Sequence, residues 1–124
     1  MNKTIVVKGR TLRETLEKSL DDLLNRIKHS KQTIGSKKEK FEVKCTRMEV
    51  CIKRFLRKIL RLAKNENFIP FNVSFEIIPR NGKWSILVSL ELEKKKEVLA
   101  RVNRIEDVLL EENRDGWRIK ITYV

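Results

Sequence analysis

The sequence predicts an α+β fold whose elements follow the order β-α-β-α-β-β, and two kinds of periodicity lead to this prediction. Several short segments alternate apolar and polar residues, which is the period of a half-buried strand. Two longer segments carry apolar residues at spacings of three and four behind a Thr-x-x-Glu capping box, which is typical of amphipathic helices. We therefore expect a two-layer sandwich with helices on one face of a mixed sheet, followed by a C-terminal helix/strand extension.

The first strand and the first helix lie at the start of the chain. Residues 4–8 are rich in β-branched side chains and predict a short strand. The capping box at residues 11–14 predicts a helix that runs to about residue 29. One stripe of apolar residues supports this helix: Leu12, Leu16, Leu20, Leu23, Leu24 and Ile27.

The second strand and the second helix follow a segment without periodicity. Residues 28–40 combine Gly35 with small polar residues and lysines, so we expect a mobile basic loop, with a plain solvated linker as the alternative. Residues 41–45 then alternate as a strand with one buried face. A second capping box at residues 46–49 predicts the start of the second helix.

The last part of the predicted core is a hairpin. Residues 71–77 and 84–92 alternate as two strands, and the pair Asn81-Gly82 between them is favoured in two-residue hairpin turns. In this pattern Phe71, Phe75 and Trp84 point into the core.

The C-terminal part of the sequence allows two interpretations. Apolar residues between 94 and 112 step by four, three and four, which predicts a third helix whose seam docks on the core or on a second copy of the chain. Residues 117–123 alternate as a final strand. A hairpin that pairs residues 108–112 with this strand is the alternative.

Charge is the strongest compositional signal. The chain has 29 Lys and Arg residues against 17 Asp and Glu, a formal net charge of +12 and a pI near 10.0. Such an excess in a small domain favours a polyanionic partner, although a cationic surface without a partner is the simpler alternative. No segment has the apolar length of a secretory or membrane-spanning helix, so we expect a cytoplasmic protein without a membrane partner.

The second helix carries a segregated basic face. Residues 51–64 contain six basic side chains and no acid. At 100° per residue, these six side chains fall within an arc of roughly 140°, and apolar residues fill the opposite side. The side chains of this arc are our main candidates for binding: Lys53, Arg54, Arg57, Lys58, Arg61 and Lys64. The basic loop adds Lys37, Lys38 and Lys40.

Candidates for catalysis are sparse. His29 is the only histidine, the four glycines are isolated at turns, and the acidic residues read as solvated faces or salt-bridge partners. Cys45 and Cys51 match neither a zinc signature nor a disulfide-rich framework, so we expect two free thiols that pack as small core residues. The sequence therefore predicts a protein that is not an enzyme and uses no cofactor or metal. Trp117 and Tyr123 are the aromatic residues most available to stack on bases, although packing inside the extension is the favoured interpretation for both.

Two stretches of the chain resemble a known family. Residues 40–45, K-F-E-V-K-C, and residues 53–67, K-R-F-L-R-K-I-L-R-L-A-K-N-E-N, are similar to the eukaryotic large-subunit ribosomal protein twenty-two family. The resemblance covers roughly residues 4–92 and implies contact with ribosomal RNA through the basic helix and loop. The order of elements is also similar to the C-terminal domain of initiation factor three, to the Alba proteins and to ThermoDBP, a single-stranded DNA-binding family with a C-terminal oligomerising helix.

These observations predict a non-enzymatic protein that binds structured or ribosomal RNA. Residues 1–93 then form the nucleic-acid-binding core, and residues 94–124 form an extension through which a homodimer could assemble. A cationic face on a fixed helix suits phosphates, because it gives affinity without sequence preference. Two alternatives remain open: a single-stranded DNA-binding protein of the ThermoDBP kind, and an adaptor that binds an acidic protein surface.

Overall fold

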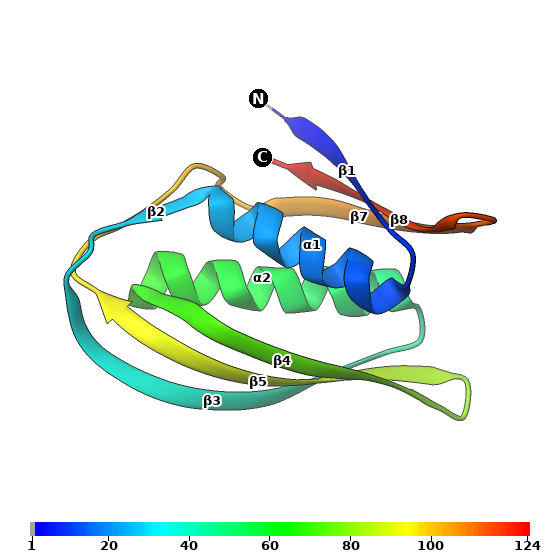
Figure 1. The fold of residues 1–124 in the computed structure, drawn as a ribbon, viewed down its shortest axis with the longest axis horizontal. Coiled ribbons are helices and arrows are strands. Elements are labelled where there is room, and N and C mark those ends of the chain that lie inside the picture. The colour runs from blue at the N-terminus through cyan, green and yellow to red at the C-terminus, as the bar shows by residue number, and fades with distance from the viewer. Residues whose placement is uncertain (1) are drawn as a thin grey trace.

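The computed structural model describes residues 2–124, which form two antiparallel three-stranded sheets with both helices between them (Figure 1). The upper sheet has the strand order β1-β8-β7 and the lower, strongly curved sheet has the order β3-β5-β4. The elements are β1 (Lys3–Gly9), α1 (Leu12–Asn25), β2 (Ile27–His29), β3 (Thr33–Cys45), α2 (Met48–Glu66), β4 (Phe68–Arg80), β5 (Lys83–Lys95), β6 (Val98–Ala100), β7 (Ile105–Asn113) and β8 (Gly116–Tyr123).

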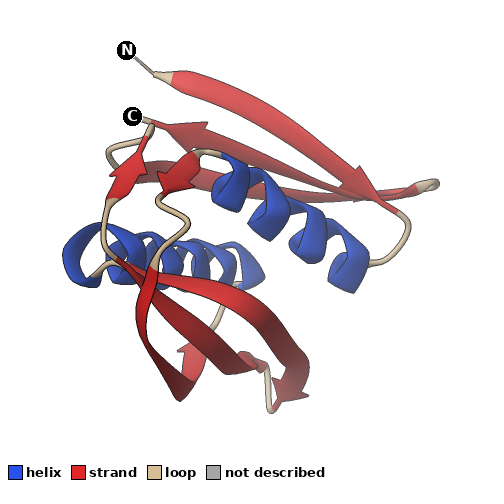
Figure 2. Cartoon of the chain, turned by 60° about the vertical axis from the view of Figure 1, so that its left-hand side comes forward, coloured by secondary structure: helices blue, strands red, loops and turns tan. Residues whose placement is uncertain are grey.

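The predicted α+β class is confirmed, but the predicted arrangement of the layers is wrong in two respects. Every strand pairing is antiparallel, so the sheet is not mixed, and the helices are enclosed between two sheets instead of covering one face of a single sheet. The short strands β2 and β6 pair with each other and connect the two halves of the molecule (Figure 2). No helix among residues 2–124 combines the length and the apolar composition that crossing a bilayer requires.

The core is built around α2. Its side chain Phe55 is fully buried and lies 6.3 Å from the ring of Phe41 and 6.0 Å from the ring of Phe75, measured between ring centroids. These two rings come from β3 and β4, so α2 fills the concave face of the lower sheet. On its other side α2 packs against β7 of the upper sheet. One continuous core therefore joins both sheets.

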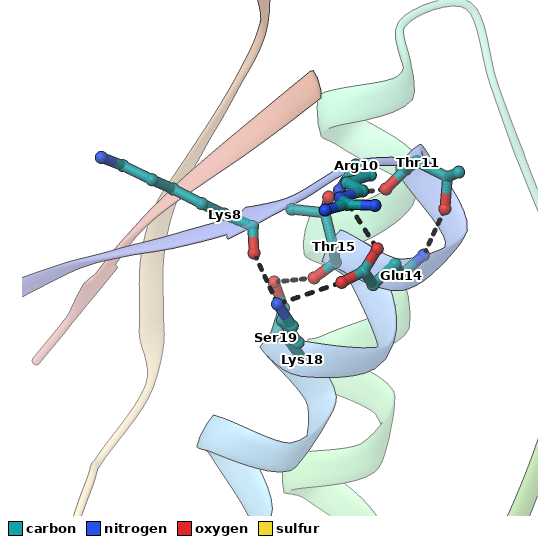
Figure 3. Close-up of polar contacts among 7 residues, drawn as sticks. All are labelled: Lys8, Arg10, Thr11, Glu14, Thr15, Lys18 and Ser19. Atoms are coloured by element: carbon teal, nitrogen blue, oxygen red, sulfur yellow. Dashed lines mark hydrogen bonds and ion pairs between the residues drawn. The ribbon is translucent and has the colours of Figure 1, made fainter. Parts of the chain in front are cut away.

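The start of α1 forms the predicted capping interactions (Figure 3). Thr11 Oγ1 accepts a hydrogen bond from the Glu14 amide at 3.0 Å, and the Glu14 carboxylate accepts one from the Arg10 amide at 3.1 Å. The Lys18 ammonium group lies 3.1 Å from the same carboxylate and is the main cause of the lowered pKa of Glu14, followed by the Arg10 amide. The second predicted capping box is wrong, because no side chain caps α2 at Arg47.

Residues 28–40 are not a loop. Most of them lie in β3, which pairs with β5 over its whole length. This polar segment is fixed by pairing with β5, from Thr33 opposite Lys95 to Lys40 opposite Ser89, and such distant pairing cannot be read from local composition.

Residues 94–112 are not a helix. They form β6 and β7, and β7 pairs with β8 as in the alternative hairpin. A β-bulge between Ile105 and Asp107 shifts the alternation of β7 by one residue, so that Ile105 and Val108 are both buried. Leu109, which the predicted helical pattern placed on the same face as Ile105, is exposed as a result.

Cys45 and Cys51 form a disulfide, which corrects the prediction of two free thiols. Cys45 ends β3 and Cys51 lies in the first turn of α2, and this connection brings their Cα atoms to 5.6 Å, within the range that a disulfide requires. The disulfide ties the start of α2 to the lower sheet.

Removal of this disulfide is expected to lower the free energy of unfolding by about 2 kcal/mol, because it closes a short loop in the unfolded chain. Urea denaturation of the Cys45→Ala/Cys51→Ala variant measures the loss. A reducing agent should destabilise the wild type to a similar extent and leave the variant unchanged. Two titratable thiols in the unreduced folded protein would contradict the disulfide.

Tyr123 fixes the last strand to α1. Its side chain is 1% exposed, and its hydroxyl donates a hydrogen bond to Asp22 Oδ2 at 3.0 Å. The guanidinium group of Arg26 lies 4.7 Å from the centre of the tyrosine ring and pairs with the same carboxylate at 2.9 Å. Tyr123 is therefore a core residue, as the favoured interpretation expected, and its ring is not available to stack on bases.

Stability is expected to fall above about pH 10, where the unfolded tyrosine loses its proton. Burial, and then the Asp22 carboxylate, raise the pKa of Tyr123 in the folded state, so the folded chain holds a proton that the unfolded chain releases. Ultraviolet absorbance of tyrosinate follows this group alone, since the chain has one tyrosine. The Tyr123→Phe variant should show a shallower loss of stability at alkaline pH than the wild type. Equal losses of stability at alkaline pH in the wild type and in Tyr123→Phe would contradict the raised pKa of Tyr123 as the cause.

Candidate nucleic-acid interface

The six basic residues predicted as the main candidates lie on one side of α2. We call them the α2 basic strip: Lys53, Arg54, Arg57, Lys58, Arg61 and Lys64. Both neighbouring sheets cover the remaining faces of α2, where the side chains are buried. The strip faces outward between two edge strands, β3 of the lower sheet and β7 of the upper sheet.

The β7 side of the strip is held by hydrogen bonds to backbone carbonyl groups. Arg57 donates from Nε and Nη2 to the carbonyl oxygen of Ile105, at 3.0 and 2.8 Å. Lys64 donates from Nζ to the carbonyl oxygen and to the side-chain oxygen of Asn103, at 2.7 and 3.0 Å. These bonds hold both side chains in place and leave their charge without a neutralising acid.

The β3 side of the strip has one backbone contact and one ion pair. Arg54 donates from Nη1 to the carbonyl oxygen of Lys44 at 2.8 Å. Lys58 lies 3.2 Å from Glu39 Oε1 and 5.7 Å from the centre of the Phe41 ring. The other carboxylate oxygen of Glu39 is buried and has no hydrogen-bond partner among the described residues.

Most of the charge of the strip is not compensated. Within residues 2–124, Lys58 is the member of the strip that forms an ion pair. The two acids of α2 lie at the helix ends, where Glu49 pairs with Arg47 and Glu66 pairs with Lys37. Lys53 and Arg61 make neither an ion pair nor a side-chain hydrogen bond with any described residue. The strip thus presents five positive charges without a carboxylate partner on the outward side of α2.

The three lysines predicted in a basic loop lie on β3 and do not form one group with the strip. Lys37 faces the end of α2, where it contacts Glu66 at 3.7 Å and lies 4.3 Å from the centre of the Phe68 ring. Lys38 and Lys40 are exposed on the strand, and Lys38 lies 3.9 Å from Glu91 of β5. The separation follows from the pleat, because neighbouring residues of a strand point to opposite faces.

The aromatic residues fall into two groups. Phe75 and Trp84 pack in or against the core as predicted, whereas Phe71 is 58% exposed because a bulge between Pro70 and Asn72 turns it outward. Trp117 is half-buried on β8, opposite Gly9 of β1. It lines a hollow of about 330 Å³ near the start of α1, away from the strip.

Sequence reasoning missed the neighbours that position the strip. Glu39, Asn103 and the carbonyl group of Ile105 contact its members, and they lie 13 or more residues from those members along the chain. A carbonyl acceptor leaves no signature in a sequence, and Glu39 lay in the segment read as a loop. Among the residues that the structure describes, no three His, Cys, Asp or Glu side chains are grouped to hold a metal. No protein-family model and no curated protein matches the chain.

Proposed function

We propose that this chain is a non-enzymatic RNA-binding protein that contacts the phosphates of structured or ribosomal RNA through the α2 basic strip. The observation that carries the proposal is the row of uncompensated cations on a helix whose other faces are buried. Arginine and lysine side chains that neutralise phosphates release condensed counterions, which gives affinity without a base-specific contact.

The surroundings of the strip support binding to a polyanion. The helix is fixed between two sheets, so its cations need little reorganisation when a ligand arrives. Arg54 and Arg57 each use part of the guanidinium group on a backbone carbonyl, and their remaining N–H groups are available for phosphate oxygens. Hydrogen bonds to neutral carbonyl groups orient a cation without cancelling its charge.

Binding of a labelled RNA hairpin, followed by fluorescence anisotropy with unlabelled competitors, tests the proposal. Matched RNA and DNA hairpins compete equally if only phosphates are contacted, and RNA competes better if the 2′-hydroxyl or the A-form shape is recognised. Because the proposed contacts are to phosphates, we expect the RNA to compete at least as well as the DNA. No measurable binding of any RNA at low salt would contradict the proposal, and a preference for DNA would shift it to a DNA-binding function. RNA crosslinked to the protein in cells would identify the natural ligand.

A further inference from the structure

The α2 basic strip is long and narrow. From Lys53 to Lys64 it spans eleven residues, which corresponds to about 16 Å along the helix axis. Its central arginines follow each other at three and four residues, or about 5 and 6 Å. Successive phosphates of a nucleic-acid strand have a comparable separation, so about three to five phosphates of one strand would match the row.

An acidic border limits the strip on one side. The edge strand β7 contains four acidic residues, Glu106, Asp107, Glu111 and Glu112, and no lysine or arginine. Glu106 pairs with Arg104 at 3.4 Å and Glu111 pairs with Arg118 at 2.8 Å, which leaves Asp107 and Glu112 without an ion pair among the described residues. The hydrogen bonds from Arg57 to Ile105, and from the Leu110 amide to Glu49, show that β7 runs alongside α2. A phosphate backbone that extended sideways over β7 would therefore meet the carboxylates of Asp107 and Glu112, which have no ion-pair partner among the described residues and repel it.

The other side of the strip adds little positive charge and no stacking surface. On β3, Lys44 is paired with Glu42 at 3.3 Å and Lys38 with Glu91 at 3.9 Å. Lys40 has no ion-pair partner among the described residues, but it is exposed on the same face of β3 as Lys38, opposite to Lys37, which contacts the end of α2. The ring of Phe41, beside the strip, is covered by Lys58. The surface around the strip thus supports one backbone and no second strand.

The strands on both sides also prevent α2 from acting as a recognition helix. An α-helix with its side chains is about 10–12 Å in diameter and fills the major groove of B-form DNA, which is about 12 Å wide. The edges of β3 and β7 add width on both sides of α2, so the helix cannot enter such a groove. The deep and narrow major groove of an RNA duplex is less accessible still.

From these observations we propose that the ligand of the strip is a single-stranded segment of RNA whose backbone runs parallel to α2. This inference rests on the proposed function and specifies the substrate of the same site. Phosphates lie along Lys53, Arg57 and Arg61, and the bases point away from the protein. Binding is therefore independent of base sequence, and a structured RNA is held by an unpaired stretch such as a loop.

Unstructured oligouridines of increasing length, compared with a blunt RNA duplex, test this inference. Affinity should rise up to about six nucleotides and then change little, because the strip accommodates only about three to five phosphates. The duplex should bind at least tenfold more weakly than a single strand with the same number of phosphates. A duplex that binds as tightly as the single strand would overturn the inference while the proposed function stands. If neither these ligands nor a long RNA binds, the proposed function fails as well.

A pair of variants tests the role of the acidic border. Glu106→Gln/Asp107→Asn removes two acids beside the strip, of which Glu106 is paired with Arg104. Glu17→Gln/Asp21→Asn makes the matching change on exposed residues of α1, where Glu17 is paired with Arg13. Asparagine at position 107 keeps a side-chain oxygen for the Val108 amide, which Asp107 caps at 2.9 Å. The measured quantity is the ratio of the Kd for the duplex to the Kd for the single strand. We expect this ratio to fall severalfold in the border variant and to stay unchanged in the α1 variant. The same ratio in both variants would contradict the acidic border as the cause of the preference for single strands over duplexes.

Discussion

The double replacement Lys53→Glu/Arg61→Glu is expected to weaken RNA binding by about a hundredfold or more at moderate salt and to leave the fold intact. Two phosphate contacts are lost and two repulsive charges take their place in the strip. The contribution of phosphate contacts to the RNA affinity therefore falls steeply. Neither side chain has a hydrogen-bond or ion-pair partner among residues 2–124, and both project from the outward side of α2. The thermal transition should therefore shift little. Titration of labelled RNA and a thermal melt measure the two effects.

The matched control for this variant is Arg80→Glu/Lys83→Glu. These two cations are exposed at the turn between β4 and β5, and their reversal gives the same net charge as the strip variant. We expect the control to lose far less affinity, because it changes the overall charge but not the row of cations. Equal losses in both variants would indicate that the protein attracts RNA only through its net charge.

Arg57 is a poor choice for this experiment. Its two hydrogen bonds to Ile105 connect α2 to the upper sheet, so Arg57→Glu would also leave a carbonyl group without its donor. Loss of binding in that variant could come from loss of structure. Replacement of Lys53 and Arg61, which have no such hydrogen bonds, separates loss of binding from loss of structure.

Truncation after residue 93 is the second change with a large expected effect, and we expect the shortened chain not to fold cooperatively. The deleted segment contains β8, the central strand of the upper sheet, and β7, which covers α2. Six of its apolar side chains are buried: Val102, Ile105, Val108, Ile119, Ile121 and Tyr123. Loss of each such side chain usually costs about 2–5 kcal/mol, and their sum equals or exceeds the typical 5–15 kcal/mol stability of a domain.

Circular dichroism and thermal denaturation of the 1–93 chain measure this effect, with the full chain under the same conditions as the reference. The proposed division into a core at 1–93 and an extension at 94–124 makes the opposite prediction. A cooperative transition in the shortened chain would show that the division is real. The proposed dimerisation through residues 94–124 is a separate prediction, which sedimentation of the full chain tests.

The elements that sequence predicts best are those whose stability is local. The position of α2 follows from apolar and basic residues that alternate with helical spacing, and the structure places every member of the basic arc on one side. The hairpin of β4 and β5 follows from Asn81-Gly82, and both residues have the positive φ that this turn requires. The capping residues of α1 are likewise neighbours in the chain.

The elements that sequence missed depend on contacts between distant residues. Lysine-rich β3 has no apolar stripe in its first half and becomes a strand through its pairing with β5. The disulfide requires the end of β3 and the start of α2 to meet, which the spacing of Cys45 and Cys51 alone does not show. The acidic edge of β7 borders the strip only because β7 is a strand and not a helix. For the binding surface, sequence therefore predicted the cations but not what surrounds them.

The dependence of RNA affinity on salt tests the role of the strip most directly. For a single strand, the logarithm of the binding constant falls with the logarithm of the salt concentration by about 0.7 per phosphate contacted. Five uncompensated cations then predict a slope of about −3.5 for the wild type, and Lys53→Gln/Arg61→Gln should reduce its magnitude by about 1.4. Parallel lines for the wild type and this variant, or a wild-type slope near zero, would contradict binding of phosphates by the α2 basic strip.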